Sequence, residues 1–168
     1  RGLICVATIA PRLDELQIGP MTPTNDSLHG TPFGVAVDYR HGTTTGISAA
    51  DRAQTILAFT RAGTHPEDFA RPGHIFPLRA VEGGVLRRAG HTEAAVDLAR
   101  LAGLFPAGVL CEVLDDDGSM ARLPRLHELA QQFGMPIITV QDLIAYRRQR
   151  EKLVRRAASA QLPTRFGD

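Results

Sequence analysis

The feature that most constrains the fold is an alternation of short apolar runs with segments of helical periodicity. The runs 3–9, 109–114 and 137–140 are short and rich in β-branched residues, as buried strands are. Between the last two runs, and before them, apolar residues recur at the three- and four-residue spacing of helices that cover a sheet. No segment repeats elsewhere in the chain. The pattern predicts an α/β protein with a mixed or parallel sheet.

Local signals refine these elements. Ser48 followed by Asp51 resembles a capping box at a helix start. The run 75–79 is expected to be irregular or at a sheet edge, because Pro77 cannot donate a ladder hydrogen bond. Thr92 is expected to cap a helix. The positions expected to face the core are Ala95, Leu98, Ala99, Leu101 and Ala102 in that helix, and Leu126, Leu129, Ala130 and Phe133 in the next.

The charge balance excludes several classes of protein. Nineteen Lys and Arg against eighteen Asp and Glu give a formal charge of +1, which provides no field for nucleic acid or an anionic membrane. No apolar run approaches the roughly 20 residues of a spanning helix. Cys5 and Cys111 are the only cysteines, so a disulfide framework is excluded and a reducing cytosol is expected. The basic stretch 147–156 is interpreted as a solvated helix face.

The most informative segment is 83–93, in which two arginines precede Gly90, His91 and a helix start. Backbone N–H groups and the helix dipole favour an anion there, and Arg88 can bind a phosphate through two hydrogen bonds. The segment therefore predicts an oxyanion or phosphate site beside an imidazole. An ordinary helix cap with surface arginines is the alternative.

Two further residues allow opposite interpretations. His74 follows a Pro-Gly turn that can hold an imidazole for proton transfer, but on spacing alone a structural histidine is favoured. Glu112 lies in an apolar run, where burial would raise its pKa towards that of a general base. An edge strand with Glu112 facing outward is equally consistent with the run. No spacing of histidines or cysteines predicts a zinc site or supports a Cys–His pair.

Four segments taken together resemble the 3,4-dihydroxy-2-butanone 4-phosphate synthase family of riboflavin biosynthesis. They are Thr44–Arg52, Arg71–His74, Gly90–Ala94 and Cys111–Glu112, and the resemblance runs from about Gly2 to Tyr146. It implies a lyase that converts D-ribulose 5-phosphate to L-3,4-dihydroxy-2-butanone 4-phosphate and formate. It also implies a cytoplasmic homodimer with its site near the subunit interface, and a three-layer α/β fold with helices on both faces of a mixed sheet.

The same resemblance assigns roles by position. His74 and Glu112 match residues that the family needs for catalysis, and for both this overturns the non-catalytic interpretation. His91 matches a metal ligand, which implies Mg²⁺ or Mn²⁺, with two ions bound. The substrate-binding positions are Arg88, Ala89, Gly90, His91, Thr92 and Glu112.

The chain departs from the family pattern in three respects. Gly34 and Thr43 stand where the family usually has Thr and Val. The acidic loop that completes the family's metal site has no counterpart before residue 3, so we expect the chain alone to be weakly active or inactive. A degenerate, non-catalytic synthase domain that supports dimerisation or a fused enzyme is therefore the alternative, and an ATP-binding acyltransferase is a weaker one.

The expected domain organisation is a synthase domain over 1–147, followed by the end of a basic helix and a linker over 148–168. The last residues resemble the junction to a GTP cyclohydrolase II domain. We therefore expect a bifunctional parent protein, with the synthase as one domain of it.

Overall fold

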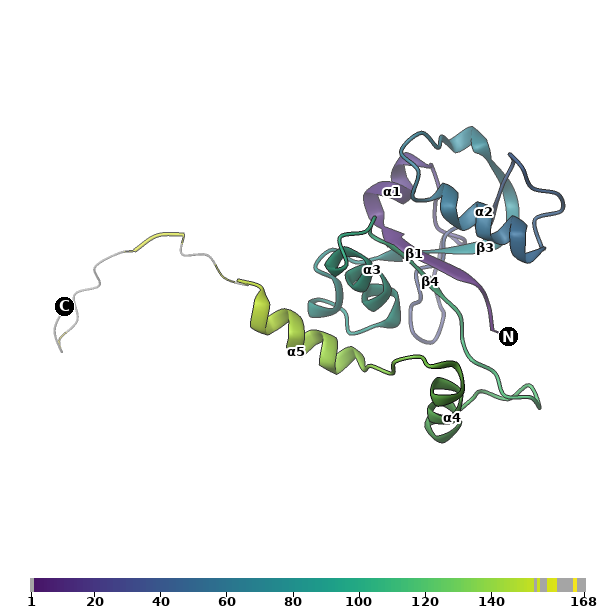
Figure 1. Cartoon of the computed structure of the whole chain (residues 1–168). Helices are drawn as coiled ribbons and strands as arrows, with labels where there is room; N and C mark the ends of the chain where they lie inside the picture. The colour runs from purple at the N-terminus through teal and green to yellow at the C-terminus, as the bar shows by residue number, and fades with distance from the viewer. Residues whose placement is uncertain (1, 153, 155–156, 160–164, 166–168) are drawn as a thin grey trace.

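Four strands form one mixed sheet in the computed structural model, which describes residues 2–152, 154, 157–159 and 165. The strands are β1 (Cys5–Ile9), β2 (Val37–Tyr39), β3 (Phe69–Ala80) and β4 (Ala107–Leu110), in the order β2-β3-β1-β4 (Figure 1). β1 pairs with β3 in parallel and with β4 in antiparallel orientation, and β2 pairs with β3 in antiparallel orientation.

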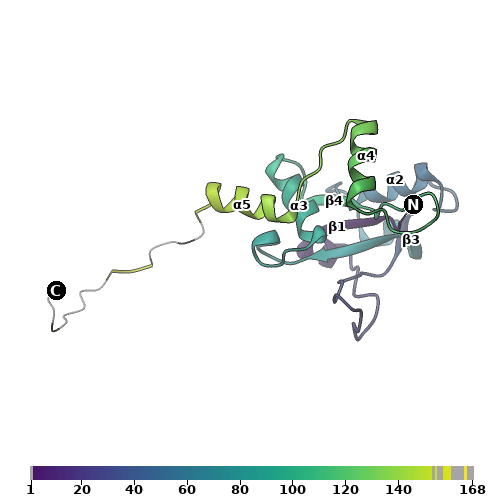
Figure 2. The same ribbon diagram turned by 90° about the horizontal axis from the view of Figure 1, so that it is seen from below.

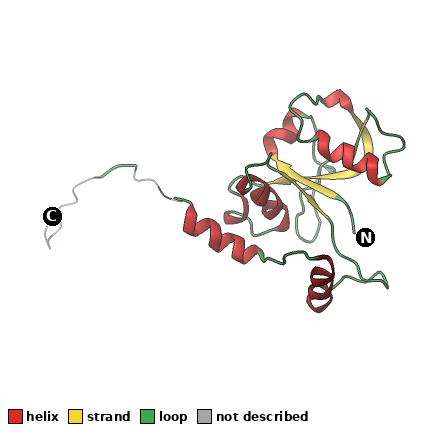
Figure 3. Ribbon diagram, viewed as in Figure 1, coloured by secondary structure: helices red, strands yellow, loops and turns green. Residues whose placement is uncertain are grey.

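Helices cover both faces of this sheet, as Figure 3 shows. The helices α1 (Ala10–Glu15) and α2 (Ala49–Ala58) pack on one face, where Val6 and Ile75 meet Leu13 and Ala58. The helix α3 (His91–Leu101) packs on the other face, where Cys5, Ala7, Leu78 and Ala80 meet Val96. The alternation of side chains along β1 separates the two cores. The expected single-domain, three-layer α/β fold is confirmed.

Two further helices lie to one side of the sheet (Figure 2). They are α4 (Leu123–Phe133) and α5 (Val140–Arg150), and the 3₁₀ turns η1 (Pro66–Asp68) and η2 (Gly84–Leu86) complete the elements of the described residues. α4 buries none of its residues, so the expectation that its apolar side chains face the core is wrong. They line an open hollow of about 640 Å³ against 111–114 and 135–138.

The structure corrects the prediction for the strand that contains Pro77. β3 is an internal strand twelve residues long, and it includes 71–74, which was expected to be a turn. The Pro77 carbonyl accepts a hydrogen bond from the Gly34 N–H at 2.8 Å. The proline nitrogen, on the same side of the strand, therefore faces the irregular segment 33–34 and removes no hydrogen bond from the pairing with β1. The run 137–140 is not a strand: its last residue begins α5.

The predicted inner face of α3 is wrong in part, because Ala95 packs against the core but the leucines do not. Leu98 and Leu101 are exposed, whereas Glu93 and Asp97 are buried. Four hydrogen bonds to these carboxylates come from Val81 N, Arg88, Val85 N and Arg147, and they compensate for the burial of charge. Thr92 is buried and does not cap the helix, because Gly90 is the N-cap residue.

The predicted boundary between residues 147 and 148 falls inside α5 and stays a prediction. Much of the predicted linker, including residues 160–164 and 166–168, lies outside the described residues. None of the described helices combines the length and the apolar character needed to cross a bilayer.

Candidate active site

Strand register brings His74 and Glu112 to the same end of the sheet. Cys5 pairs with Phe76 on one side and with Leu110 on the other. Two residues back along β1, the same register places Leu3 between His74 and Glu112. Pairing continues there, since the Gly2 N–H donates to the Glu112 carbonyl at 3.1 Å and the Leu3 N–H donates to Glu112 Oε2 at 3.0 Å.

The first turn of α3 lies on the same face of the sheet. Phe76 and Leu110 pack in the core that α3 covers, and side chains two residues further along an extended strand point to that same face. His91 lines a hollow of about 340 Å³ together with Gly108, Val109 and Leu110 of β4. The topology thus places His74, Glu112 and His91 on one face of one sheet end.

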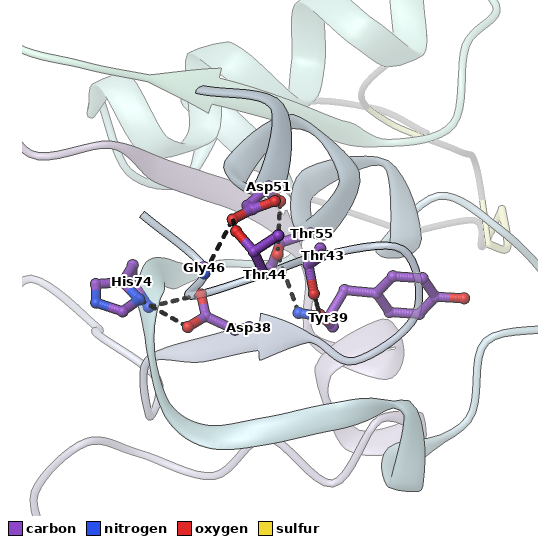
Figure 4. Close-up of polar contacts among 8 residues, drawn as sticks. All are labelled: Asp38, Tyr39, Thr43, Thr44, Gly46, Asp51, Thr55 and His74. Carbon is purple, nitrogen blue, oxygen red and sulfur yellow. Dashed lines mark hydrogen bonds and ion pairs between the residues drawn. The ribbon is translucent and has the colours of Figure 1, made fainter. Parts of the chain in front are cut away.

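Asp38 of β2 holds His74 in a fixed orientation (Figure 4). One carboxylate oxygen accepts from the His74 backbone N–H at 2.9 Å, and the other lies 2.7 Å from His74 Nδ1. An ionised carboxylate can only accept, so in the neutral imidazole Nδ1 carries the proton and Nε2 is left as an acceptor. The His74 side chain is 43% exposed and that of Asp38 13%. The pair therefore offers a proton acceptor to solvent or to a bound molecule.

A second carboxylate, that of Asp51, organises the loop that follows β2. Asp51 Oδ2 accepts from Thr44 Oγ1 at 2.7 Å and from the Gly46 N–H at 3.1 Å (Figure 4). The Thr44 hydroxyl is the largest cause that lowers the pKa of Asp51, and backbone N–H groups add to it. Ser48 caps α2 by accepting from the Asp51 N–H at 3.0 Å. This is half of the predicted capping box, because the Asp51 carboxylate binds the loop instead.

The expected anion site contains a charge pair that the sequence did not reveal. Arg88 Nη1 lies 3.0 Å from Glu93 Oε2, and Nη2 donates to the His29 carbonyl at 3.4 Å. A Cβ on Gly90 would come 2.7 Å from Glu93 Oε2, so glycine permits this close packing. No side chain caps the N-terminus of α3. Its first N–H groups can bind an anion, but the Arg88 charge is shared with Glu93.

Glu112 is exposed, two residues beyond the end of an edge strand. The prediction of a buried carboxylate is wrong: Glu112 is exposed, as the alternative expects, but it lies beyond β4 and not within an edge strand. One of its oxygens is held by Leu3 N–H, which orients the carboxylate. Cys5 lies on β1 opposite Leu110, two residues before Glu112. Its thiol is buried, and this burial is the largest cause that raises the pKa of Cys5 to about 11, followed by the charges of Glu112 and Cys111. The Cys5 thiol therefore stays protonated and is not a nucleophile.

The described residues do not form a metal site on their own. No group of three or more His, Cys, Asp or Glu side chains in this part of the chain is arranged to hold an ion. His91 is exposed, but Glu93, two residues further along, is fully buried and bound to Arg88. Mg²⁺ needs several oxygen ligands, and one imidazole does not supply them.

Sequence reasoning missed Asp38 and Asp51 as site residues. Asp38 directly follows the apolar run 33–37 and lies within β2. A charged residue at the end of such a run is a signal that could have drawn attention to it. Asp51 was explained by the helix cap alone. Neither contact is visible without the pairing of β2 with β3, since Asp38 and His74 are 36 positions apart.

Comparison with known proteins identifies the family of the chain. The model of the 3,4-dihydroxy-2-butanone 4-phosphate synthase family matches residues 1–146. The chain belongs to this family. The riboflavin biosynthesis protein RibBA of Aquifex aeolicus is 57% identical over 169 residues, which cover 99% of this chain and 42% of that protein. A chloroplastic bifunctional riboflavin biosynthesis protein of Arabidopsis thaliana is 55% identical over 180 residues, 99% of this chain and 31% of its own length.

Solved synthase structures share the fold. The two-domain synthase RibBX of A. baumannii superposes with a TM-score of 0.89 at 46% identity, over 99% of this chain and 49% of that one. A synthase crystallised with two magnesium ions gives a TM-score of 0.85 at 40% identity, over 89% of this chain and 74% of that one. The chain spans less than half the length of the two curated relatives above.

Proposed function

We propose that the chain catalyses the lyase reaction expected from its family, the conversion of D-ribulose 5-phosphate to L-3,4-dihydroxy-2-butanone 4-phosphate and formate. The observation that carries the proposal is the placement of His74, bound to Asp38, on the same face and sheet end as Glu112 and the start of α3. A basic nitrogen and a carboxylate can transfer protons, and a helix N-terminus can bind the phosphate group of a sugar phosphate.

His74 Nε2 is the proposed base that removes the C3 proton of the substrate. Asp38 keeps the proton of the imidazole on Nδ1 and stabilises the imidazolium that forms. One water is then lost, the carbon skeleton migrates, one water returns, and the former C4 leaves as formate. Atoms balance, since the five carbons of the substrate become four carbons plus formate. Glu112, oriented by Leu3 N–H, shares the proton transfers and holds substrate hydroxyls.

The phosphate is proposed to bind at the first turn of α3, within the segment 88–92. The N–H groups of the first turn from His91 onward, which no side chain caps, provide the donors. The guanidinium of Arg88 contributes the part of its charge that Glu93 does not neutralise. Ala89 and Thr92 border the site, with Ala89 exposed and Thr92 buried.

Mg²⁺ or Mn²⁺, with two ions bound, remains the proposed metal requirement. Its support is the related synthase crystallised with two magnesium ions. His91 is the residue proposed to ligate an ion, and the other ligands come from outside the described residues, because these contain no cluster that could hold a metal. The steps above are therefore assigned to side chains of the chain alone.

The proposed assembly is a cytoplasmic homodimer in which the synthase is one domain beside a GTP cyclohydrolase II. The bifunctional relative of Arabidopsis supports the fusion. The open apolar hollow beside α4 supports a second copy of the chain. Cys5 and Cys111 are both free thiols, which supports a reducing compartment.

Formate release tests the proposal. In the intact protein with Mg²⁺, His74→Gln and Glu112→Gln are each expected to lower turnover of D-ribulose 5-phosphate by about 100-fold or more, because each removes a group that transfers protons. His127→Gln, on the exposed α4, is the matched control and should leave turnover unchanged. A decrease of less than about tenfold would remove that residue from the mechanism. A folded wild-type protein that binds ribulose 5-phosphate but releases no formate would support the degenerate alternative.

A further inference from the structure

The backbone of Gly46, in the loop 42–48, lies beside the Asp38 carboxylate (Figure 4). Gly46 in this loop has a φ of +86°, and a Cβ built on it would come 2.1 Å from Asp38 Oδ2 and 2.4 Å from Cγ. Only a glycine backbone fits so close to the carboxylate. Gly46 therefore packs directly on the Asp38 oxygen that lies next to His74 Nδ1, and it limits how this carboxylate can turn.

Asp51 holds this loop in place. Its side chain is buried, with the residue 4% exposed, and one oxygen binds both Thr44 Oγ1 and Gly46 N–H. The helix that carries Asp51 is itself attached to β2 beside Asp38, because Thr55 Oγ1 accepts from the Tyr39 N–H at 3.0 Å and donates to the Asp51 carbonyl at 3.0 Å. Thr43 Oγ1 donates to the Tyr39 carbonyl from the loop side.

We propose that Asp51 and Gly46 are positioning residues for the base of the reaction. Asp51 fixes the backbone of Gly46, Gly46 confines the carboxylate of Asp38, and Asp38 fixes the tautomer and orientation of His74. Neither positioning residue touches the substrate. The inference rests on the proposed role of His74 as proton acceptor, and it extends that role to a buried carboxylate on a helix of the opposite sheet face.

The test uses the intact protein with Asp51→Ala, which removes both hydrogen bonds to the loop, and Asp51→Asn, whose amide oxygen can still accept from Gly46 N–H. Ser48→Ala is the matched control, because it removes the helix cap next to Asp51 and leaves the hydrogen bonds from Thr44 and Gly46 to the carboxylate intact. Two kinds of measurement are made. One is the ¹⁵N shifts of His74 Nδ1 and Nε2 at a pH where the imidazole is neutral, and the other is the kinetics of formate release, as kcat and KM.

Asp51→Ala is expected to convert His74 from one tautomer to a mixture and to lower kcat by about tenfold, with KM changed less than about twofold. Asp51→Asn should restore most of the single-tautomer ¹⁵N shifts and most of kcat, and Ser48→Ala should change neither. Wild-type ¹⁵N shifts and kcat in a folded Asp51→Ala protein would overturn the inference. If that variant does not fold, Thr44→Val removes one of the two hydrogen bonds to the Asp51 carboxylate. Wild-type ¹⁵N shifts and kcat in Thr44→Val would equally overturn the inference.

The two proposals fail separately. If the wild-type protein releases no formate, the proposed function is wrong, but the ¹⁵N shifts still show whether Asp51 positions His74. If formate is released and His74→Gln abolishes its release, but Asp51→Ala changes neither the ¹⁵N shifts nor kcat, only the positioning role is wrong.

Discussion

At the scale of single residues, the candidate site depends on carboxylates whose partners come from distant parts of the chain. Asp38 binds an imidazole 36 positions away, and Glu112 binds a backbone N–H 109 positions away. Each carboxylate thereby fixes a group at the same sheet end. Removing such a partner leaves the imidazole or the carboxylate present but free to rotate, and misplaced groups transfer protons poorly.

Asp38→Asn should lower kcat for formate release by about 100-fold in the intact protein. The amide of the asparagine donates towards Nδ1 of His74, which favours the tautomer with its proton on Nε2, and that nitrogen can then no longer accept. The matched control is Asp68→Asn, since Asp68 also lies 2.7 Å from a histidine nitrogen, that of the exposed His41. Equal losses in the two variants would show that the effect is not specific to the site.

Asp51 should also contribute to the acid sensitivity of the fold. Its pKa is lowered from 3.8 in the folded chain, chiefly by the Thr44 hydroxyl. A group with a depressed folded pKa stabilises the fold above its unfolded pKa, and that stability is lost as the pH falls through the folded value. Asp51→Asn should therefore flatten the decline of unfolding free energy below about pH 4. Urea unfolding at several pH values measures this, and an unchanged decline would contradict it.

The sequence could predict His74 but not its partner. A histidine after a Pro-Gly pair within a family motif is visible in one dimension, and so is the start of α3, where we propose that the phosphate binds. Asp38 and the pairing of Arg88 with Glu93 become visible only when the elements pack, because each depends on contacts across the fold or on which face of a helix is buried.

At the scale of elements, α3 shows why periodicity can identify a helix and still assign it the wrong face. Its leucine stripe predicts a buried side with Leu98 and Leu101, but its acidic side is the buried one. The polar groups of the 81–88 segment and of α5 satisfy Glu93 and Asp97 there. Which face packs inward was therefore decided by partners that lie elsewhere in the sequence.

Arg147→Met tests this buried arrangement. Arg147 Nη1 lies 2.7 Å from Asp97 Oδ2 and donates to the Gly83 carbonyl at 2.9 Å, so it connects α5 to α3 and to the turn that precedes α3. Without it, Asp97 is buried with its charge unpaired, which should cost about 3–5 kcal/mol of stability. Hydrogen exchange should accelerate over 83–90. Arg148→Met, which changes an exposed neighbour, is the control. Equal changes in stability and in hydrogen exchange for the two variants would contradict this role of Arg147.

At the scale of the whole molecule, topology explains the site better than any single motif does. The four family segments lie on different elements, and the order β2-β3-β1-β4 brings the ones that carry His74 and Glu112 to one sheet end. The layered fold could be predicted because strands and helices alternate. The central place of β3 could not be predicted, because a proline such as Pro77 indicates an edge strand. The structure accommodates Pro77 because its side of the strand faces the irregular segment 33–34.

Metal binding by residues 1–168 alone should be weak. The described residues contain no cluster of ligands, and His91 offers a single imidazole. Calorimetry with Mg²⁺ is therefore expected to give a Kd above about 1 mM for this chain, because Mg²⁺ gives up its water shell only for several well-placed oxygens. A Kd in the low micromolar range would show that the chain has its own site. His91→Ala, compared with His127→Ala, would then show whether His91 belongs to it.

The apolar hollow beside α4 should be covered by a second copy of the chain. Phe133 is 63% exposed at its edge, and Glu112 lies on the opposite wall, so a partner seated there would border the site. Phe133→Asp should shift the intact protein from dimer to monomer in sedimentation at micromolar concentration and lower formate release with it. Leu57→Asp, an exposed leucine on α2, is the control and should leave both unchanged. A wild-type protein that sediments as a monomer would refute the dimer, whereas a dimer that Phe133→Asp leaves intact would place its interface elsewhere.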